Sequence, residues 1–454
     1  MTNLIDPARP APEPPTAATE AVGPGEEGRG HPGRLAGLAA LLVFAGVMGG
    51  WSLLVMIFAL VVMIFLHELG HFLTAKSAGM GVTEFFIGFG PRIWSFRRGE
   101  TEYGLKVIPA GAYVKIIGMH NLDEFDPADA DRTYMSKPFW RRLSVAVAGS
   151  TMHFIIAAVC FTVAFALVGL PGGRFVTTES ELDDLQANAV WSVDQVSDDS
   201  AAAAAGILAG DRILAIDDTE IQGFDQFRDL VISLPGEEVE VLIERDGVQQ
   251  VVPVEIGTAE GDDGEERGFF GVGPRLENAT VPISEVPGRT VAAFGAMVGQ
   301  TFSGLAHILS PSGLASIGEA AFTSSDGADT APDGGGSSGS SSSGGGNEPQ
   351  AAGLVGISAV GSGLLGAGEF GNFLALFAAI NIFIGVFNLV PLLPLDGGHV
   401  AIACYEKVRS MLQGGRAYHV DVVKLLPVTY AVVMVLAFLG ISLLVLDTRT
   451  LVGG

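Results

Sequence analysis

Cysteine is nearly absent from this chain. The 454 residues include two, Cys160 and Cys404, and both lie in apolar or near-membrane stretches. Two such cysteines cannot build a disulfide framework, and neither has the spacing of a thiolate metal site. Histidine is also scarce, with 8 residues, so a metal-binding pattern among them seldom arises by chance.

Basic residues are half as frequent as acidic ones. The chain has 25 Lys and Arg against 50 Asp and Glu, a formal net charge of −25. Residues 171–290 hold 26 acidic and 7 basic side chains, so 19 of the 25 excess negative charges lie there. This charge excludes nucleic acid as an expected partner and favours a water-facing domain that is kept soluble by self-repulsion.

Charged residues of both signs are few compared with apolar ones. They make up 17% of the chain against 48% hydrophobic residues, and the mean hydropathy is +0.43. This balance indicates an α-helical, multi-pass protein of the cell membrane with a soluble insert, in contact with the lipid bilayer. Long apolar runs predict four spans, at Trp51–Lys76, Leu143–Leu170, Phe370–Val390 and Leu426–Leu446.

The remaining segments divide the chain. Residues 1–33, rich in Pro, Glu, Gly and Ala, are expected to form a disordered tail. Residues 34–50 contain a 14-residue apolar run, short of the roughly 20 that a span needs, and form either an extra membrane helix or an interfacial one. The other predicted parts are a first membrane half at 51–170, a linker region at 291–369 with a flexible Ser/Gly-rich loop at 323–350, and a second membrane half at 370–454.

The sequence His67-Glu68-Leu69-Gly70-His71 follows the apolar run Trp51–Leu66 within the first predicted span. Side chains at positions i and i+4 share one face of a helix, so both imidazoles of this HExxH pattern can reach one cation. Glu68 lies about 100° round the helix from His67, close enough to take a proton from a metal-bound water. The alternative is a set of polar residues that pairs helices, which is expensive because each ionisable group in hydrocarbon costs about 2.5–3.5 kcal/mol.

A third ligand must come from elsewhere, because a catalytic zinc usually takes three protein ligands. The candidates in apolar surroundings are His153, Asp396 and His399. Asp396 lies in NLVPLLPLDGGH at 388–399, where two prolines and two glycines must break the third span. A broken helix at membrane depth is tolerated only beside protein or a wet cavity, and an acid there is a functional candidate.

Basic residues indicate how the chain is oriented. They concentrate in the loop between the first two spans and recur between the last two, and both loops are therefore expected to be cytoplasmic. The active site is then expected toward the cytoplasmic side and the acidic region 171–290 outside the cytoplasm. In the first loop, Thr101–Ile108 and Ala112–Ile117 predict a small membrane-associated β hairpin that turns at Pro109–Gly111.

Residues 206–216, GILAGDRILAI, resemble the core motif A-G-L-x-x-G-D-x-I-x-x-I of PDZ domains. The resemblance covers about 190–257, with a helix expected at Phe224–Leu234 and strands at Val239–Glu244 and Val251–Ile256. It implies an inserted α/β PDZ-like domain. Such a domain either binds extended peptide ends by strand addition or is a folded spacer that blocks large substrates.

Three features together resemble the site-2 proteases, which are intramembrane zinc metalloproteases of the M50 type. They are the HELGH sequence, the later N-x-x-P-x-x-P-L-D-G at 388–397, and the PDZ-like insert. Phe89-Gly90-Pro91 and Pro109-Ala110-Gly111 are similar to the family's strand region. The resemblance covers about 51–275 and 370–446 and is nearest to the actinobacterial branch that cleaves anti-sigma factors.

The resemblance implies roles for individual residues. His67, His71 and Asp396 would bind Zn²⁺, and Glu68 would be the catalytic acid/base whose activated water attacks a peptide carbonyl. Asn388 matches an asparagine that helps hold the unwound substrate. The implied function is regulated intramembrane proteolysis of membrane-protein substrates, with single-span anti-sigma factors expected among them.

The chain departs from the family pattern in two places. The second span begins Gly149-Ser-Thr-Met-His153 where Gly-x-x-x-Asn is common, so His153 either replaces a substrate contact or packs between helices. A Gly-Pro-Val-Gly-Ile-like motif is degraded, with remnants at 312–317 or 353–357. His399 either supports the metal site or oxyanion or has a plain structural role.

Two other functions remain open from the sequence. A non-cleaving membrane scaffold would recruit partners through the PDZ-like domain, although a dead relative should have lost Glu68 or a ligand. A metal transporter would use the same intramembrane His and Asp ligands, but it usually needs internal repeats, and none is evident.

Overall fold

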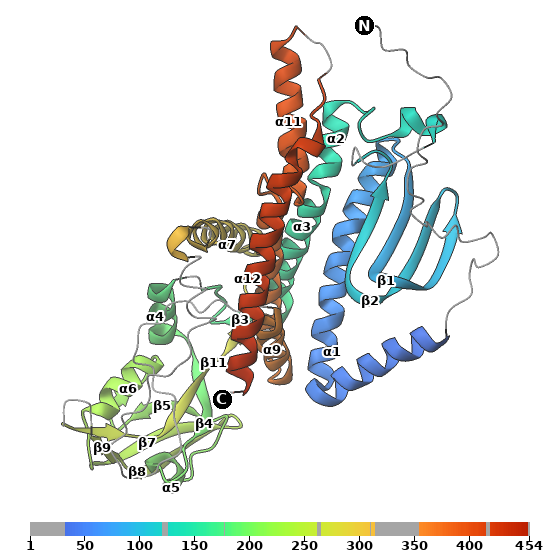
Figure 1. Ribbon diagram of the computed structural model, residues 1–454. Helices are drawn as coiled ribbons and strands as arrows, with labels where there is room; N and C mark the ends of the chain where they lie inside the picture. Colours follow the sequence, from blue (N-terminus) through green and yellow to red (C-terminus); the bar gives the residue numbers. More distant parts are fainter. Residues whose placement is uncertain are drawn as a thin grey trace, which may run out of the picture.

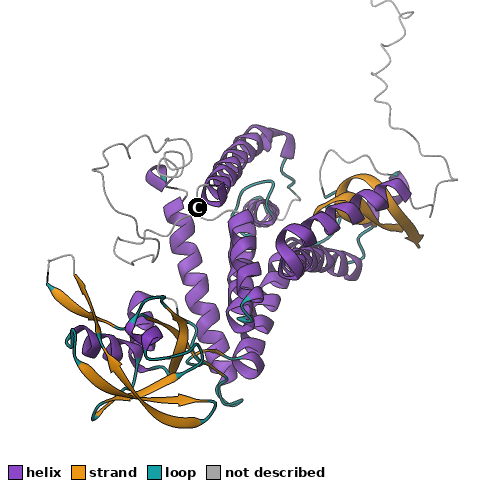
Figure 2. Cartoon of the chain, turned by 90° about the horizontal axis from the view of Figure 1, so that it is seen from below, coloured by secondary structure: helices purple, strands orange, loops and turns teal. Residues whose placement is uncertain are grey.

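The computed structural model describes residues 32–119, 126–176, 178–260, 265–308, 310–313, 354–414 and 418–452. A bundle of apolar helices separates two groups of strands, which lie on opposite sides of it (Figures 1 and 2). The predicted tail, apart from its last two residues, and the predicted Ser/Gly-rich loop at 323–350 lie outside the described residues.

Five helices in the described part of the chain are long and apolar enough to cross a membrane. They are α1 (Pro32–Ser77), α3 (Ala148–Val163, continued by the π-helical turn η2 at Ala164–Val168), α7 (Val286–Ile308), α10 (Phe370–Asn388) and α12 (Leu426–Val452). Four of them fall on the predicted spans. The multi-pass α-helical fold is therefore confirmed.

The helix α7 corrects the sequence prediction, which placed 291–369 in a linker region. It packs against α3 and α10, and the shorter apolar helix α9 (Leu354–Gly366) packs against α1 and α10. Its mean hydropathy of 1.2 is the lowest of the five, because polar residues such as Gln300 and His307 interrupt the apolar ones. Its apolar run therefore does not stand out in the sequence.

Gly50 divides α1 into two segments. Its φ of 65° and ψ of −167° are outside the helical region, and they are conformations that glycine adopts without steric cost. The apolar segment before Gly50 therefore leaves the line of the HExxH helix at an angle (Figure 1). Its large side chains are exposed, among them Phe44, Val47 and Met48.

The two strands predicted as a hairpin do not pair with each other, because residues 84–87 lie between them in an antiparallel sheet made of β1 (Val82–Arg98) and β2 (Thr101–Ile116). Residues 84–87 pair on one side with 112–115 and on the other with 102–105, so each long strand contributes two segments. β1 was missed because Gly88, Gly90 and Pro91 interrupt its pattern. Phe85 packs on Phe65 and Phe72, which anchors the sheet to the HExxH helix.

The acidic region folds into a separate unit with its own core. The elements expected at 224–234, 239–244 and 251–256 are α6 (Phe224–Ile232), β7 (Glu238–Arg245) and β8 (Val248–Glu255). The other elements are α4 (Glu179–Asn188), β4 (Trp191–Val196), α5 (Ala201–Ala204), β5 (Arg212–Ile216), β6 (Thr219–Glu220), β9 (Gly257–Glu260), β10 (Glu266–Phe269) and β11 (Val272–Leu276). One sheet has the order β6-β5-β7-β8.

This unit extends beyond the boundary near 257 that the sequence indicated. After β8 the chain returns to β4, the strand with which the unit's sheets begin: β11 pairs with β4 and ends the unit near Leu276. Two short strands, β3 (Leu170–Pro171) and β12 (Asn278–Ala279), pair where the unit joins the helices. The backbone N–H of Val281 also donates to the carbonyl of Phe165.

Asp211 gives a structural reason for the Gly-Asp pair in the PDZ-like motif. Its side chain is 1% exposed and accepts hydrogen bonds from the Leu208 N–H at 2.8 Å and from Arg245 at 2.7 and 2.6 Å. These contacts tie the loop at 206–211 to β7. Burial opposes ionisation, yet the hydrogen bonds from Arg245 and Leu208 hold the pKa of Asp211 below its usual value.

We expect the inserted unit to lose stability in acid. A carboxylate whose pKa is lowered by folding stabilises the fold above its unfolded pKa of about 3.9, and this stabilisation is lost as the pH falls through the lower folded pKa. Asp211→Ala should lower the free energy of unfolding by about 1–3 kcal/mol at neutral pH and flatten the acid dependence.

The measurement is urea unfolding of the whole protein, followed by the fluorescence of buried Trp191. The exposed Trp51, Trp94 and Trp140 are replaced by phenylalanine so that a single reporter remains. A wild-type urea midpoint that is as acid-sensitive as that of Asp211→Ala would contradict this account.

Candidate metal centre

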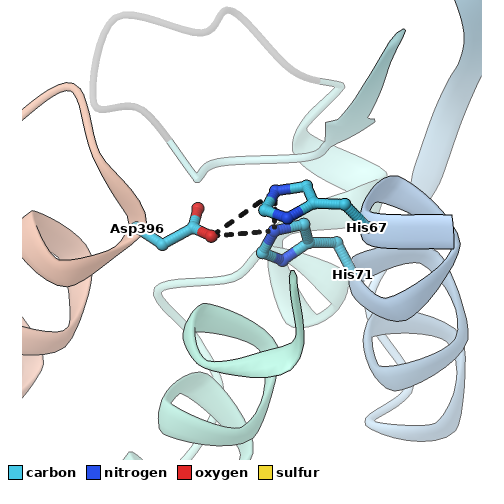
Figure 3. Close-up of side chains that lie close together, drawn as sticks. All are labelled: His67, His71 and Asp396. Carbon is cyan, nitrogen blue, oxygen red and sulfur yellow. Dashed lines mark hydrogen bonds and ion pairs between the residues drawn. The ribbon is translucent and has the colours of Figure 1, made fainter. Parts of the chain in front are cut away.

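The helix α1 carries both histidines of the HExxH pattern on one face. His67 and His71 point across a gap toward α11 (Asp396–Leu412), as Figure 3 shows. Their Nε2 atoms lie 3.3 Å apart, and their ring centroids are 4.9 Å apart. The i, i+4 spacing therefore brings the two imidazoles together as predicted.

The helix break that the sequence predicted supplies the third group. α10 ends at Asn388, and α11 begins at Asp396 after the proline-containing turn. Gly397 and Gly398 allow this turn to fold back tightly, because a Cβ at either position would collide with backbone atoms of residues 389–393. Asp396 thus occupies the first position of a helix that the break aims at α1.

The three groups converge at the distances of a zinc site. Oδ2 of Asp396 lies 3.3 Å from Nε2 of His71 and 3.6 Å from Nε2 of His67. Ligand atoms about 2.0–2.2 Å from a tetrahedral zinc lie about 3.3–3.6 Å from one another. The three separations therefore match three edges of one coordination tetrahedron.

The hydrogen bonds around the site leave the ligand atoms free for a cation. Nδ1 of His71 donates to the carbonyl of Val145 at 2.8 Å, so Nε2 of the neutral ring carries no proton. Oδ2 of Asp396 and Nδ1 of His67 are buried without a hydrogen-bond partner. A buried carboxylate oxygen without a hydrogen-bond partner is costly unless a cation lies beside it, so His67, His71 and Asp396 fit a zinc ion.

Close helix packing holds the imidazoles in place. Gly149 of α3 lies against both rings, and a Cβ there would collide with His67 and His71. Gly70 of α1 lies in turn against the backbone of Ala148. These two glycines let α1 and α3 approach closely enough for the second span to cover the site.

Glu68 lies between the metal ligands and the sheet. It interacts with the backbone N–H of Val114 in β2 and lines a cavity of about 990 Å³ together with His67 and His153. The cavity is bounded mainly by apolar side chains of α1, α7, α9 and α10. Glu68 therefore faces both the metal ligands and this cavity.

His153 is buried between helices and also faces this cavity. Its Nδ1 lies 3.0 Å from Oδ1 of Asn381, whose Nδ2 donates to the carbonyl of Phe377 at 2.7 Å. Because the amide is oriented by Phe377, His153 must donate from Nδ1, which leaves Nε2 without that proton. Both the packing role and the substrate role are thus compatible with its position.

Asn381 was missed by the sequence analysis. It is fully buried in α10, and its place as an asparagine within an apolar span is the signal that could have identified it. Asn388 lines the same cavity as Glu68. His399 does not join the three converging groups; its ring lies 6.4 Å from that of Tyr134.

Comparison with known proteins agrees with this geometry. Residues 55–436 match Peptidase family M50. The chain is 32% identical over 395 residues to zinc metalloprotease Rip1 of Mycobacterium tuberculosis (strain ATCC 25618 / H37Rv), covering 84% of this chain and 93% of the relative. It is also 32% identical over 414 residues to zinc metalloprotease Rip1 of Mycolicibacterium smegmatis, covering 86% of this chain and 95% of the relative.

A family match over most of the chain and relatives at this identity decide between the functions that the sequence left open, in favour of the enzyme. Zinc is accordingly the cofactor, and several apolar helices agree with a membrane-embedded protease. The chain belongs to peptidase family M50, the site-2 proteases, and is a zinc metalloendopeptidase of the multi-pass membrane type.

Proposed function

We propose that the protein cleaves the transmembrane segments of other membrane proteins, with Glu68 as the catalytic acid/base. The observation that carries this proposal is a large apolar cavity among candidate membrane helices, which is lined by Glu68 and by His67, one of the three converging groups. A site in that position meets substrates that are themselves embedded in lipid. A soluble peptide would have no need of such a cavity.

His67, His71 and Asp396 would hold the zinc ion. When bound, zinc acts as a Lewis acid that polarises the scissile carbonyl and lowers the pKa of a coordinated water. Glu68 accepts a proton from the attacking water on its carboxylate and returns one to the nitrogen of the leaving amine. Water and peptide are thereby converted to a carboxylic acid and an amine, and Glu68 returns to its starting state.

A transmembrane helix must unwind before its carbonyl can be attacked, because an intact helix keeps its backbone groups paired. Asn388 and His153 line the cavity beside the metal ligands and offer polar contacts to an unwound segment. We assign both residues to substrate binding, with His153 held in place by Asn381.

The sheet offers a second means of holding the unwound segment. The segment at 112–116 lies beside Glu68 and pairs with β1 along one edge. The N–H groups of Val114 and Ile117 point to opposite sides, since Val114 faces Glu68 and Ile117 donates to Gly81. Alternate N–H groups, including that of Ala112, are then available to an added strand.

Orientation and partners follow from the charge distribution. The basic loop with β1 and β2 would face the cytoplasm and the acidic unit the opposite side, which would release a cytoplasmic fragment. Single-span anti-sigma factors fit as substrates, because they are membrane-anchored regulators of cytoplasmic proteins. The inserted unit would be a PDZ-like domain that binds an extended peptide or excludes large substrates.

Glu68→Gln should lower the rate of cleavage at least about 100-fold, because it removes the acid/base group, while the protein keeps its zinc. Asp396→Ala should lose both activity and zinc, because a ligand is removed. Cleavage of a single-span test substrate in micelles and zinc content per mole are measured on the same samples.

Ser144→Ala provides the control, because Ser144 is exposed and donates to the backbone carbonyl of Arg141 rather than to the site. Cleavage by purified Glu68→Gln protein at the wild-type rate would refute the role assigned to Glu68. Full zinc content in Asp396→Ala protein would refute the ligand assignment.

Ala112→Pro tests strand addition by removing one N–H from the edge of 112–116 that is opposite its pairing with β1. We expect the KM for a single-span substrate to rise about 2- to 10-fold, the loss expected for one hydrogen bond, with kcat little changed. Ala112→Gly keeps the N–H group and should keep the wild-type KM. Equal KM values for the two variants would argue against an added strand.

A further inference from the structure

The two halves of the metal site are joined a second time, away from the ligands, by a buried ion pair. Nη2 of Arg142 lies 2.6 Å from Oε2 of Glu406, and the two residues are 264 positions apart. Arg142 is 6% exposed and Glu406 3%. Among the ion pairs of the described residues, this pair has both charged side chains almost fully enclosed.

Arg142 is linked to His71 through the helix that carries it. It belongs to the short helix α2 (Phe139–Ala146), three residues before Val145, whose carbonyl accepts the hydrogen bond from Nδ1 of His71. Tyr134 fixes Arg142 from the other side, because its ring lies 5.2 Å from the guanidinium carbon and its hydroxyl donates to the carbonyl of Arg142. The position of α2 therefore determines the orientation of the His71 ring.

Glu406 connects to Asp396 through the body of α11. The two residues lie ten positions, or about 15 Å, apart on the same helix. The second oxygen of Glu406 accepts a hydrogen bond from the backbone N–H of Val420 at 2.7 Å. Glu406 therefore also fixes the segment that leads through η3 (Val422–Leu425) into α12.

These contacts form a closed ring. It runs from Asp396 to His71 across the ligand gap, from His71 through Val145 to Arg142, and from Arg142 through Glu406 back along α11 to Asp396. The helices α1 and α11 belong to different halves of the chain, and the turn at 389–395 connects α11 to α10. Without the second link, rotation about that turn would move the Asp396 carboxylate.

The energetics favour a role beyond general stability. Burying two charges costs several kcal/mol each, and their attraction offsets this cost only at close range. A pair of apolar side chains would hold α2 to α11 at least as strongly but would tolerate sliding. A short, directional ion pair between Arg142 and Glu406 instead sets one relative position of the two helices.

We propose that Arg142 and Glu406 are positioning residues of the zinc site, which hold the Asp396 carboxylate within coordinating distance of His67 and His71. This inference rests on the ligand set assigned under the proposed function. Neither residue contacts the zinc ligands directly, so the effect is transmitted through α2 and α11. We therefore expect that breaking the ion pair speeds the loss of zinc from protein that is still folded.

The test measures the rate at which full-length protein in micelles loses zinc to an excess of chelator. Arg142→Met and Glu406→Gln each leave one buried charge unpaired, so zinc should be lost about 10–100-fold faster than from wild type, the range for groups that orient metal ligands. With Co²⁺ in place of zinc, the visible spectrum of both variants should shift toward that of Asp396→Asn.

Asp211→Asn and Arg245→Met are the matched controls. They break the ion pair of the inserted unit, which also joins a buried acid to an arginine, far from the metal ligands. Zinc loss in these two variants should match wild type. Equal acceleration in the controls would overturn the proposal, because the effect would then reflect stability in general.

Zinc loss at the wild-type rate from both Arg142→Met and Glu406→Gln would also overturn it. Should neither fold, Arg142→Lys decides, since it keeps the charge but lacks the planar fork and its stacking on Tyr134. Faster zinc loss from Arg142→Lys supports the proposal and an unchanged rate overturns it. Asp396→Ala distinguishes failure of the ligand assignment from failure of the positioning role. If Asp396→Ala retains zinc, the ligand assignment is wrong. If Asp396→Ala loses zinc and the Arg142 and Glu406 variants do not, only the positioning role is wrong.

Discussion

The convergence of one carboxylate oxygen and two imidazole nitrogens in an apolar interior is the constraint on which the structure depends. Such groups are expensive to bury unless a cation satisfies them together. The fold accepts this cost at one place, where the HExxH helix, the second span and the broken third span meet. Glycines at 70, 149, 397 and 398 make the approach of these helices possible. Side chains at these positions would keep the ligands apart.

Much of the site could be predicted from the sequence, because its signals are local. The i, i+4 spacing places both histidines on one face of a helix. The prolines and glycines around Asp396 indicate the helix break that puts this acid at the start of a helix. The partners of Arg142 and His153 could not be predicted. Glu406 and Asn381 lie more than 200 positions away, and pairing at that separation depends on how the helices cross.

The fold, like the site, could be predicted where the sequence signal is local and could not where it depends on distant contacts. Strong apolar runs located four spans, and a PDZ-like motif located the core of the inserted unit. The helix α7 was missed since polar residues interrupt its apolar run, and the strand β1 was missed since glycine and proline weaken its pattern. Both owe their form to what they pack against. The closing strand β11 was missed for another reason, because it pairs with a strand about 80 residues earlier.

The pairing of β3 with β12 has a consequence for how such proteases diversify. The inserted unit leaves the helical body and returns to it through two adjacent strands, and Arg275 of β11 adds an ion pair to Glu369. Insertions, deletions or exchanges in the chain between β3 and β12 leave the spacing between the second span and α7 unaltered. The inserted unit and the site of bond cleavage can therefore evolve separately within one polypeptide.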